Sequence, residues 1–279
     1  MLAIPPAKPE ARAGRHTRLG VLGWPVAHSR SPQMMAAALA AVGLDDWRYQ
    51  LLPVPPELFA ETTRALPAAG FRGANVTIPH KEAALALADE ATQSARAIGA
   101  ANTLMFDPSG RTLADNTDAP ALLASLPCSP RGASALVLGA GGSARAAVWA
   151  LRSAGASEVR VWNRSPERAR RLAAELGCRA AADARPADVL INCTPVGRDG
   201  DALAFKQLPL GADELAMFGC VVDFVYGGQE TALVRAARAA GVPAVDGLEL
   251  LVGQGALSFE RFTGRPAPVA AMRAAVRGR

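Results

Sequence analysis

The chain of 279 residues lacks the features that mark membrane-spanning, secreted and metal-binding proteins. No apolar run reaches the roughly 18–20 residues that a membrane-spanning helix needs. Residues 1–15 are Pro, Ala and basic residues without the apolar core of a signal peptide, and we expect them to be disordered. The four cysteines lack the spacing of metal ligands: Cys128, Cys178, Cys193 and Cys220. We therefore expect a cytoplasmic protein with free, buried thiols, no metal and no membrane contact.

Aromatic residues and dense basic runs are also scarce. Aromatic side chains make up 5% of the chain, and the net charge of +5 is not concentrated in one segment. A nucleic-acid-binding surface usually needs both features, so we expect no nucleic-acid partner. A modest positive charge suits an enzyme whose cofactor and substrate are anions. Half of the residues are hydrophobic, as in an ordinary globular protein, and the length suffices for two domains.

Short apolar segments alternate with helical patterns in two series along the chain. In the first series we expect strands at 18–23, 47–52, 72–78, 103–106 and 112–114, and helices at 32–42, 56–66, 81–98 and 118–126. In the second we expect strands at 135–138, 159–162, 189–192 and 220–223, and helices at 143–154, 166–176, 231–240 and 248–262. Such alternation predicts two α/β units with mostly parallel sheets, and the turn-rich segment 127–132 is a candidate boundary between them.

The second series opens with a dinucleotide-binding turn. The apolar run 135–138 leads into a G-x-G-x-x-A pattern, and a helical pattern follows at once. Gly139 permits a sharp turn, Gly141 lets the backbone approach a pyrophosphate, and Ala144 allows close packing of helix on strand. The phosphate is expected on the helix N-terminus. The cofactor-binding residues of this turn are Gly139, Ala140, Gly141, Gly142, Ser143 and Ala144. An ordinary glycine-rich turn is the alternative.

The next strand, 158–162, ends in Asn163 and Arg164 rather than in the carboxylate that usually binds the ribose of NAD. A guanidinium suits the 2′-phosphate of NADP in charge and in shape. We therefore predict NADP as the cofactor, bound by Arg164 and by Arg168 one turn later. The alternative is that the arginines at this helix start are merely solvated, and it applies more readily to Arg168, Arg170 and Arg171.

Polar residues crowd the ends of the strands in the first series. The segments are GWPVAHSRSP at 23–32, GANVTIPHK at 73–81, and GAANTL at 99–104 with DNTD at 115–118. Helix capping by Ser31 and turn formation by Asn75, Asn102 and Asn116 are the simple alternatives. Together with GAGGSARA, NRS, NCTPVG, DFVY and GLELLVGQGALSF, these segments resemble the shikimate dehydrogenase family, in the family's order, across residues 20 to 264.

The resemblance implies roles for individual residues. Lys81 and Asp118 form the catalytic pair at the reacting oxygen. The implied substrate-binding residues are Ser29, Ser31, Thr77, Asn102, Tyr226 and Gln254. The implied cofactor-binding residues are Asn163 and Arg164 at the adenosine phosphate, Thr194 along the cofactor path, and Gly247 near the nicotinamide. The implied fold is a discontinuous substrate-binding domain of residues 16–120 and 245–279, with an NADP-binding Rossmann domain of residues 121–244.

The residue chemistry agrees with the implied catalytic pair. Reduction of a ketone by hydride produces an alkoxide, which a positioned cation with a proton to give stabilises. The chain has very few lysines and uses arginine as its usual surface cation, so Lys81 at a strand–helix junction is a stronger candidate than a solvated lysine. His28 and His80 are weaker candidates, because the Lys81 and Asp118 pair fits better.

The sequence therefore predicts reversible reduction of 3-dehydroshikimate to shikimate by NADPH, in the pathway to chorismate and the aromatic amino acids. A monomer or a homodimer is expected. One alternative is a quinate/shikimate dehydrogenase that uses NAD, and Arg164 argues against it. A second is a ligand-sensing homologue without catalysis, and the intact Lys81, Asp118 and glycine turn argue against that.

Overall fold

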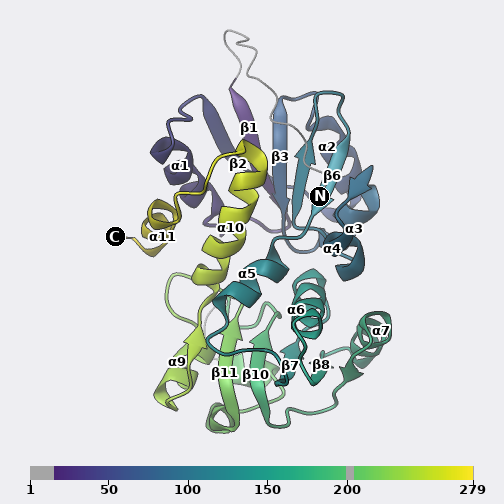
Figure 1. The fold of residues 1–279 in the computed structure, drawn as a ribbon, viewed down its shortest axis with the longest axis vertical. Coiled ribbons are helices and arrows are strands. Elements are labelled where there is room, and N and C mark those ends of the chain that lie inside the picture. The colour runs from purple at the N-terminus through teal and green to yellow at the C-terminus, as the bar shows by residue number, and fades with distance from the viewer. Residues whose placement is uncertain (1–15, 199–203, 279) are drawn as a thin grey trace. The chain divides into compact units, whose positions relative to one another are not determined.

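The structure is a computed structural model that describes residues 16–198 and 204–278. The predicted disorder of residues 1–15 lies outside this described part. The chain divides into two compact units, one made of the described residues up to Thr117 and from Gln254 onward, the other of Asp118–Gly253 (Figure 1). Among the described residues, no helix is both long and apolar enough to cross a membrane.

The first unit is built on a six-stranded mixed sheet in the order β2-β1-β3-β5-β6-β4. Its strands are β1 (Thr17–Gly23), β2 (Trp47–Pro53), β3 (Phe71–Val76), β4 (Glu90–Ala91), β5 (Thr103–Phe106) and β6 (Thr112–Asp115). β1 pairs in parallel with β2 and β3, and β4 with β6, whereas β5 runs antiparallel to β3 and β6. β5 and β6 form a hairpin, in whose turn the Asp107 carboxylate accepts hydrogen bonds from the backbone N–H groups of Ser109 and Arg111 at 2.8 and 2.9 Å.

Helices of the first unit follow the strand ends. They are α1 (Ser31–Ala41), η1 (Pro56–Leu58), α2 (Phe59–Ala65), α3 (Lys81–Leu87), α4 (Gln93–Ile98), α11 (Val269–Arg277) and the part of α10 (Gly247–Thr263) from Gln254 onward. The helical pattern over 81–98 is interrupted by β4, and α4 starts afresh because the Thr92 hydroxyl caps it by accepting from Ala95 N at 3.2 Å. The sequence reading did not predict α11, which packs against α1.

The second unit contains a six-stranded sheet whose pairings are all parallel. Its strands are β7 (Ser134–Leu138), β8 (Glu158–Trp162), β9 (Arg179–Ala180), β10 (Ala187–Asn192), β11 (Phe218–Asp223) and β12 (Ala244–Val245). The order β12-β11-β10-β7-β8-β9 is that of a Rossmann sheet, with the topological switch between β7 and β10. The predicted α/β class with a Rossmann-type domain is confirmed.

Helices precede, connect or follow the parallel strands of the second unit. They are α5 (Asp118–Ser125), α6 (Gly142–Ser153), α7 (Pro166–Leu176), α8 (Ala204–Gln207), η2 (Ala212–Met217), α9 (Ala232–Ala239) and the first turns of α10. β7 and β10 are central and fully covered, which explains their continuous apolar sequences: Leu136, Leu138 and Leu190 are all 0% exposed.

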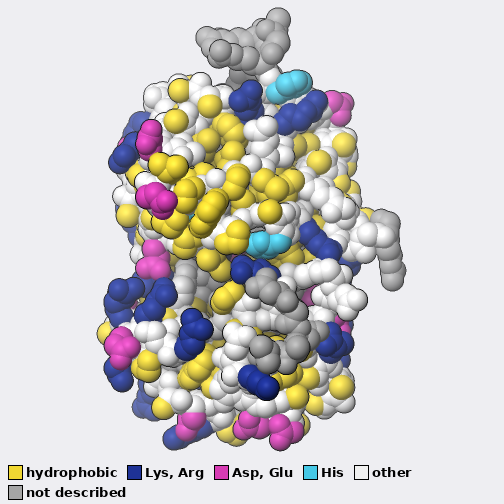
Figure 2. Space-filling view, turned by 180° about the vertical axis from the view of Figure 1, so that it is seen from behind, with side chains coloured by type: hydrophobic (Ala, Val, Ile, Leu, Met, Phe, Trp, Pro, Cys, Tyr) yellow, Lys and Arg dark blue, Asp and Glu magenta, His cyan; other side chains and the backbone are white. Residues whose placement is uncertain are grey.

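Exposed hydrophobic side chains and thiols are unevenly distributed. The large exposed hydrophobic residues among those described, Trp24, Leu51, Leu58 and Ile78, all belong to the first unit. Figure 2 shows hydrophobic side chains gathered on one face of that unit. The four described cysteines are not joined in disulfides, but the expectation that all are buried is wrong, because only Cys220 on β11 is buried. Cys178 and Cys193 are half-buried and Cys128 is exposed.

Candidate active site

Three polar segments of the first unit meet where β1 and β3 end and β5 begins. A Cβ atom on Gly23 would lie 2.5 Å from Cγ2 of Thr77, so only glycine allows the two segments to approach so closely. Trp24 N donates to the carbonyl of Ile78 at 3.0 Å, and Ala101 N donates to the carbonyl of Lys81 at 2.8 Å. The fold therefore brings the segments of Ser29 and Ser31, of Thr77 and Lys81, and of Asn102 to one edge of the sheet.

The two serines lie at the entrance to α1. Ser29 is half-buried, and its Oγ atom accepts a hydrogen bond from Ser31 N at 3.3 Å. Ser31 is buried as the first residue of the helix, while Arg30 occupies the N-cap position without a capping side-chain bond. Helix capping by Ser31, the simple alternative, is therefore wrong. Thr77 is half-buried on the neighbouring strand end.

Lys81 and Asp118 are both buried ionisable residues at helix starts. Lys81 opens α3 and is 8% exposed, and Asp118 opens α5 and is 6% exposed. Lysine and aspartate are rarely buried without a partner or a function, so the alternative of a solvated Lys81 is wrong. Asp118 directly follows Thr117, whose backbone is held in the network described next.

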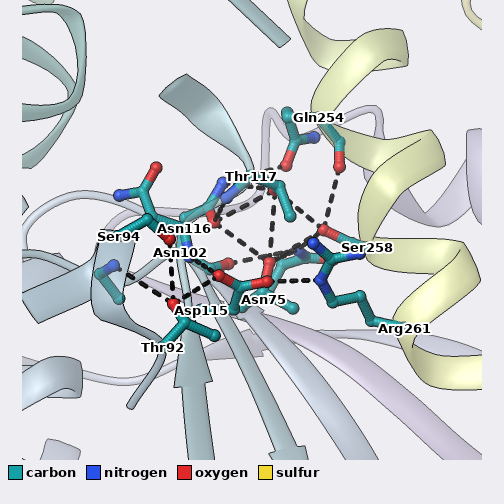
Figure 3. A network of polar contacts seen from close by, with 12 residues as sticks. Asn75, Thr92, Ser94, Asn102, Asp115, Asn116, Thr117, Gln254, Ser258 and Arg261 are labelled. Carbon is teal, nitrogen blue, oxygen red and sulfur yellow. Dashed lines mark hydrogen bonds and ion pairs between the residues drawn. The ribbon is translucent and has the colours of Figure 1, made fainter. Parts of the chain in front are cut away.

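A buried network of hydrogen bonds fixes the orientation of the Asn102 amide (Figure 3). Its Oδ1 atom accepts from the backbone N–H of Thr117 at 2.8 Å, and a backbone N–H can only donate. The Nδ2 atom must then point the other way, where it donates to Thr117 Oγ1 at 2.9 Å and to Gln254 Oε1 at 3.4 Å. Gln254 accepts through Oε1 in this contact, and both amides belong to one chain of polar contacts.

Ser258 on α10 is the junction of this network. Its hydroxyl donates to the Gln254 carbonyl at 3.0 Å and accepts from Asn75 Nδ2 at 2.8 Å, and Thr117 Oγ1 lies 3.1 Å away. Asn75 lies in β3 and its Oδ1 accepts from the Tyr49 hydroxyl at 2.9 Å, so turn formation does not explain Asn75. The sequence reading missed Ser258, although it is a polar residue four positions after Gln254 and hence on the same face of a predicted helix.

Asp115 anchors the segment that leads to Asp118. It is 3% exposed, and its Oδ2 atom forms an ion pair with Arg261 Nε on α10. Its Oδ1 atom accepts from Asn116 N and from the Thr92 hydroxyl, each at 2.8 Å. The backbone before Asp118 is therefore held by charge and by hydrogen bonds from several elements.

His80 has a structural role. Its ring is 2% exposed, stacks on Phe59 with ring centroids 4.3 Å apart, and its Nε2 atom lies 2.7 Å from the Val54 carbonyl. Burial lowers the pKa of His80, although the Val54 hydrogen bond opposes this. The ring is therefore kept neutral and packed, which agrees with the preference for Lys81 over His80.

In the second unit, the glycine turn meets the loop after β10 at the topological switch. Gly139 has a φ of +109°, and a Cβ atom there would lie 3.1 Å from the backbone carbon of Cys193. Gly141, by contrast, has nothing within 4 Å of a Cβ position, and the following residues Gly142 and Ser143 open α6. Packing within the protein therefore explains Gly139, while the space at Gly141 suits a ligand that approaches the helix N-terminus. Ala144 is fully buried, as its predicted close packing requires, and Ala140 is buried as well.

The arginines after β8 fall into two groups. Arg170 and Arg171 form ion pairs with Glu167 and Glu175 at 3.4 and 3.8 Å. Arg164 and Arg168 are exposed and have no side-chain partner within the described residues. Asn163 donates from Nδ2 to the Ser165 carbonyl at 3.0 Å and so shapes the turn that presents Arg164. Two exposed guanidinium groups at the strand tip suit a phosphate.

A second buried network connects the loops after β10 and β11. Asn192 Oδ1 accepts from both the N–H and the hydroxyl of Thr194, at 3.0 and 2.7 Å, and its Nδ2 atom donates to Asp223 Oδ1 at 2.9 Å. Asp223 also accepts from Val225 N at 3.0 Å and from the Thr231 hydroxyl at 2.6 Å. Burial raises the pKa of Asp223 to about 6, although these hydrogen bonds act to lower it.

Tyr226 and Gly247 lie beside this second network. Tyr226 is half-buried in the loop after β11. A Cβ atom on Gly247 would lie 2.4 Å from the Val225 carbonyl oxygen, so glycine is required where α10 begins beside that loop. Within the described residues, no three His, Cys, Asp or Glu side chains are grouped as a metal site. The glycine turn and the loops that follow β10 and β11 in the second unit suit a phosphorylated dinucleotide.

Known families match most of the chain. The shikimate dehydrogenase substrate-binding domain matches residues 21–104, the shikimate/quinate 5-dehydrogenase family matches 124–194, and the shikimate 5′-dehydrogenase C-terminal domain matches 247–277. A shikimate dehydrogenase (NADP⁺) of Methylobacterium radiotolerans is 47% identical over 263 residues, which cover 88% of this chain and 91% of that protein. One of Anaeromyxobacter sp. strain K is 45% identical over 281 residues, 95% and 98% of the two chains.

A solved structure agrees with these relatives. The shikimate 5-dehydrogenase of Thermus thermophilus, crystallised in complex with NADP(H) and shikimate, is 42% identical. It superposes with a TM-score of 0.82 over 94% of this chain and 98% of that one. The chain belongs to the NADP-dependent shikimate dehydrogenase family.

Proposed function

We propose that the protein catalyses the reversible NADPH-dependent reduction of 3-dehydroshikimate to shikimate. The observation that carries the proposal is the buried Lys81 at the head of α3, at the sheet edge that also carries Asn102, whose oriented amide contacts Gln254 on α10. A buried cation beside amide donors suits an anionic, hydroxylated ring with a reducible carbonyl group.

We assign the binding of the substrate to hydroxyl side chains and to amide side chains. The hydroxyls of Ser29 and Ser31 bind its carboxylate, with Thr77 on the adjoining strand end and Tyr226 contributing a further hydroxyl. The ring oxygens are assigned to Asn102 and Gln254, whose amides are linked to each other and to Thr117 and so hold fixed positions at the site. This arrangement favours a ligand rich in acceptor oxygens.

Lys81 and Asp118 transfer the proton to and from the reacting oxygen. In the reduction, Lys81 Nζ donates a hydrogen bond to the carbonyl oxygen, stabilises the negative charge that develops there, and delivers the proton. Asp118 keeps Lys81 oriented and takes part in returning its proton. In the oxidation the same groups remove the proton from the hydroxyl.

The cofactor is NADP, which supplies or accepts the hydride when bound. Gly139, Gly141 and the start of α6 receive the pyrophosphate, because the Cβ position of Gly141 faces open space. Arg164 and Arg168 bind the 2′-phosphate, and their lack of partners within the described residues supports this role. Thr194 and Gly247 line the path to the nicotinamide. These residues lie in the unit of Asp118–Gly253, which suggests the cofactor domain at 121–244.

The test is turnover of purified protein with NADPH and 3-dehydroshikimate, followed as loss of the nicotinamide absorbance. Shikimate must be identified as the product, and the reverse reaction must proceed with NADP. Absence of turnover in both directions, in protein that binds NADPH, contradicts the proposal and favours a ligand-sensing homologue.

A cytoplasmic location and a monomeric or homodimeric state are also part of the proposal. Cell fractionation checks the location, and sedimentation at several protein concentrations checks the assembly.

A further inference from the structure

Two of the four cysteines lie side by side in the second unit, although 92 residues separate them in the chain. The Sγ atoms of Cys128 and Cys220 are 3.5 Å apart. Cys220 is on β11 and is 1% exposed, whereas Cys128 is exposed in the segment between α5 and β7. One sulfur can therefore be reached from solvent, and the other lies directly behind it.

The backbone at both positions is fixed by neighbouring structure. Cys220 is held in register with Val189 in the middle of the parallel sheet. The segment that carries Cys128 is anchored at both ends, by Leu126 N donating to the Leu122 carbonyl at 3.2 Å and by Gly132 N donating to the Gly155 carbonyl at 2.8 Å. The 3.5 Å contact between the two sulfur atoms must shorten to the roughly 2 Å of a disulfide bond.

The two thiols differ in reactivity. Burial raises the pKa of Cys220 to about 12, and the Cys128 thiol and the Asp188 carboxylate contribute to this rise. Cys220 therefore stays protonated and inaccessible to reagents in solution. Oxidation begins at accessible sulfurs, so Cys128 is the first to react, and Cys220 is placed to resolve the product.

We propose that Cys128 and Cys220 are an oxidation site that forms an intramolecular disulfide when the protein meets a peroxide. In the first step Cys128 Sγ attacks the peroxide, the O–O bond breaks, and Cys128 becomes a sulfenic acid while hydrogen peroxide yields one water. In the second step Cys220 Sγ attacks Cys128 Sγ, the S–O bond breaks, and the hydroxide leaves with the Cys220 proton as a second water. The two electrons pass from the sulfurs to the peroxide, and a thiol reductant reverses the bond.

The position of the disulfide determines its effect. Cys128 precedes the start of β7 and Cys220 precedes Asp223 by three residues, so the bond lies toward the amino ends of the strands. Gly139 and the loop after Asp223, which we assign to the cofactor, follow the carboxyl ends. The disulfide therefore closes a long loop of the second unit and leaves the proposed cofactor residues in place. It also stops the oxidation of Cys128 at a reversible stage.

The experiment is oxidation of the folded full-length protein with hydrogen peroxide, followed by intact mass and by peptide mapping. We expect a mass lower by two hydrogen atoms, a Cys128–Cys220 peptide, and two remaining titratable thiols. The midpoint of thermal unfolding should rise by about 5–10 °C and return on addition of dithiothreitol.

Three variants make the test specific. Cys128→Ser and Cys220→Ala should abolish the crosslinked peptide, and Cys220→Ala should let Cys128 proceed to the sulfinic acid. Cys178→Ser is the matched control: Cys178 is half-buried and its pKa is also raised, to about 11, by burial, and this variant should form the disulfide as the unaltered protein does. Retention of four titratable thiols, equal sulfinic acid formation with and without Cys220, or a crosslink of Cys128 to any other cysteine overturns the proposal.

Discussion

The Oδ1 atom of Asn102 accepts a hydrogen bond from the backbone N–H of Thr117 at 2.8 Å, and this contact orients the amide. The orientation leaves the Asn102 Nδ2 group pointing toward Gln254. Because Thr117 immediately precedes Asp118, the same contact holds the start of α5. One hydrogen bond thus connects a proposed substrate-binding side chain with the segment that carries a proposed catalytic residue.

Loss of the Ser258 hydroxyl should weaken substrate binding without affecting the chemical step. Ser258→Ala removes the partner that Asn75 Nδ2 has at 2.8 Å and loosens the support of Gln254. We expect the KM for shikimate to rise about five- to tenfold and kcat to change less than about twofold. Ser125→Ala is the matched control, because Ser125 makes a similar hydroxyl-to-carbonyl bond to Leu122 at 2.8 Å, outside the network. A fall in kcat with unchanged KM contradicts this role.

Substitution of the catalytic pair should be strongly non-additive. Lys81→Met and Asp118→Asn should each lower kcat by about 10²–10⁴-fold, because each removes part of one proton-transfer unit. The double variant should be scarcely slower than Lys81→Met alone. Initial rates and far-UV circular dichroism of the variants test this, with Lys206→Met on α8 as the control for loss of an exposed lysine. Losses that multiply in the double variant would show that the residues act independently.

Removal of Arg164 should change the preference between cofactors. Arg164→Ala should raise the KM for NADP about tenfold or more and leave the KM for NAD nearly constant, since only NADP carries the 2′-phosphate. Arg170→Ala is the control, because Arg170 is already paired with Glu167. Equal effects of Arg164→Ala on both cofactors contradict the proposed phosphate site.

The buried carboxyl of Asp223 should give the stability of the protein a defined pH dependence. Its pKa is raised from 3.8 to about 6, so between these values the folded state binds more protons than the unfolded state. This group therefore adds stability at low pH that is lost as the pH rises from about 4 to about 6. Asp223→Asn removes the effect while keeping an amide oxygen for Asn192 and Val225.

Urea unfolding of both proteins at pH 4.5 and pH 7.5 measures this contribution. The stability of the unaltered protein relative to Asp223→Asn should fall by about 2 kcal/mol between the two pH values. A difference that does not depend on pH contradicts the assignment.

His80 should be replaceable without loss of catalysis. His80→Gln retains a donor for the Val54 carbonyl but loses the stacking on Phe59. We expect a stability loss of about 1–2 kcal/mol, and kcat within about threefold of the unaltered enzyme at all pH values where the protein is folded. A kcat that falls by orders of magnitude, or loss of one limb of the pH–rate profile, would make His80 a proton-transfer group.

The sequence predicts the main strands and helices of both units, but it misses β4 and α11 in the first unit and β9, β12, α8 and η2 in the second. In the second unit, the helix over 166–176 has the predicted limits. Short elements such as β4, β9 and β12 escape prediction because two residues of strand have no periodicity. In the first unit, the direction of β5 depends on the hairpin turn at Asp107, which makes the sheet mixed.

The polar segments of the site are visible in the sequence, but their connections are not. The contacts of Ser258, Asp115 and Arg261 join residues more than a hundred positions apart, and spacing along the chain cannot reveal them. The burial of Lys81 also depends on how α3 packs. The sequence also cannot show that Cys128 and Cys220, 92 positions apart, lie in contact.

The most direct test of the account is a comparison of kcat/KM for shikimate and quinate, each with NADP and with NAD. We predict that shikimate with NADP gives the highest value of the four and exceeds shikimate with NAD by about a hundredfold or more, because only NADP offers a 2′-phosphate to Arg164 and Arg168. Comparable values with NAD or with quinate would contradict it and would place the protein among the broader quinate/shikimate dehydrogenases.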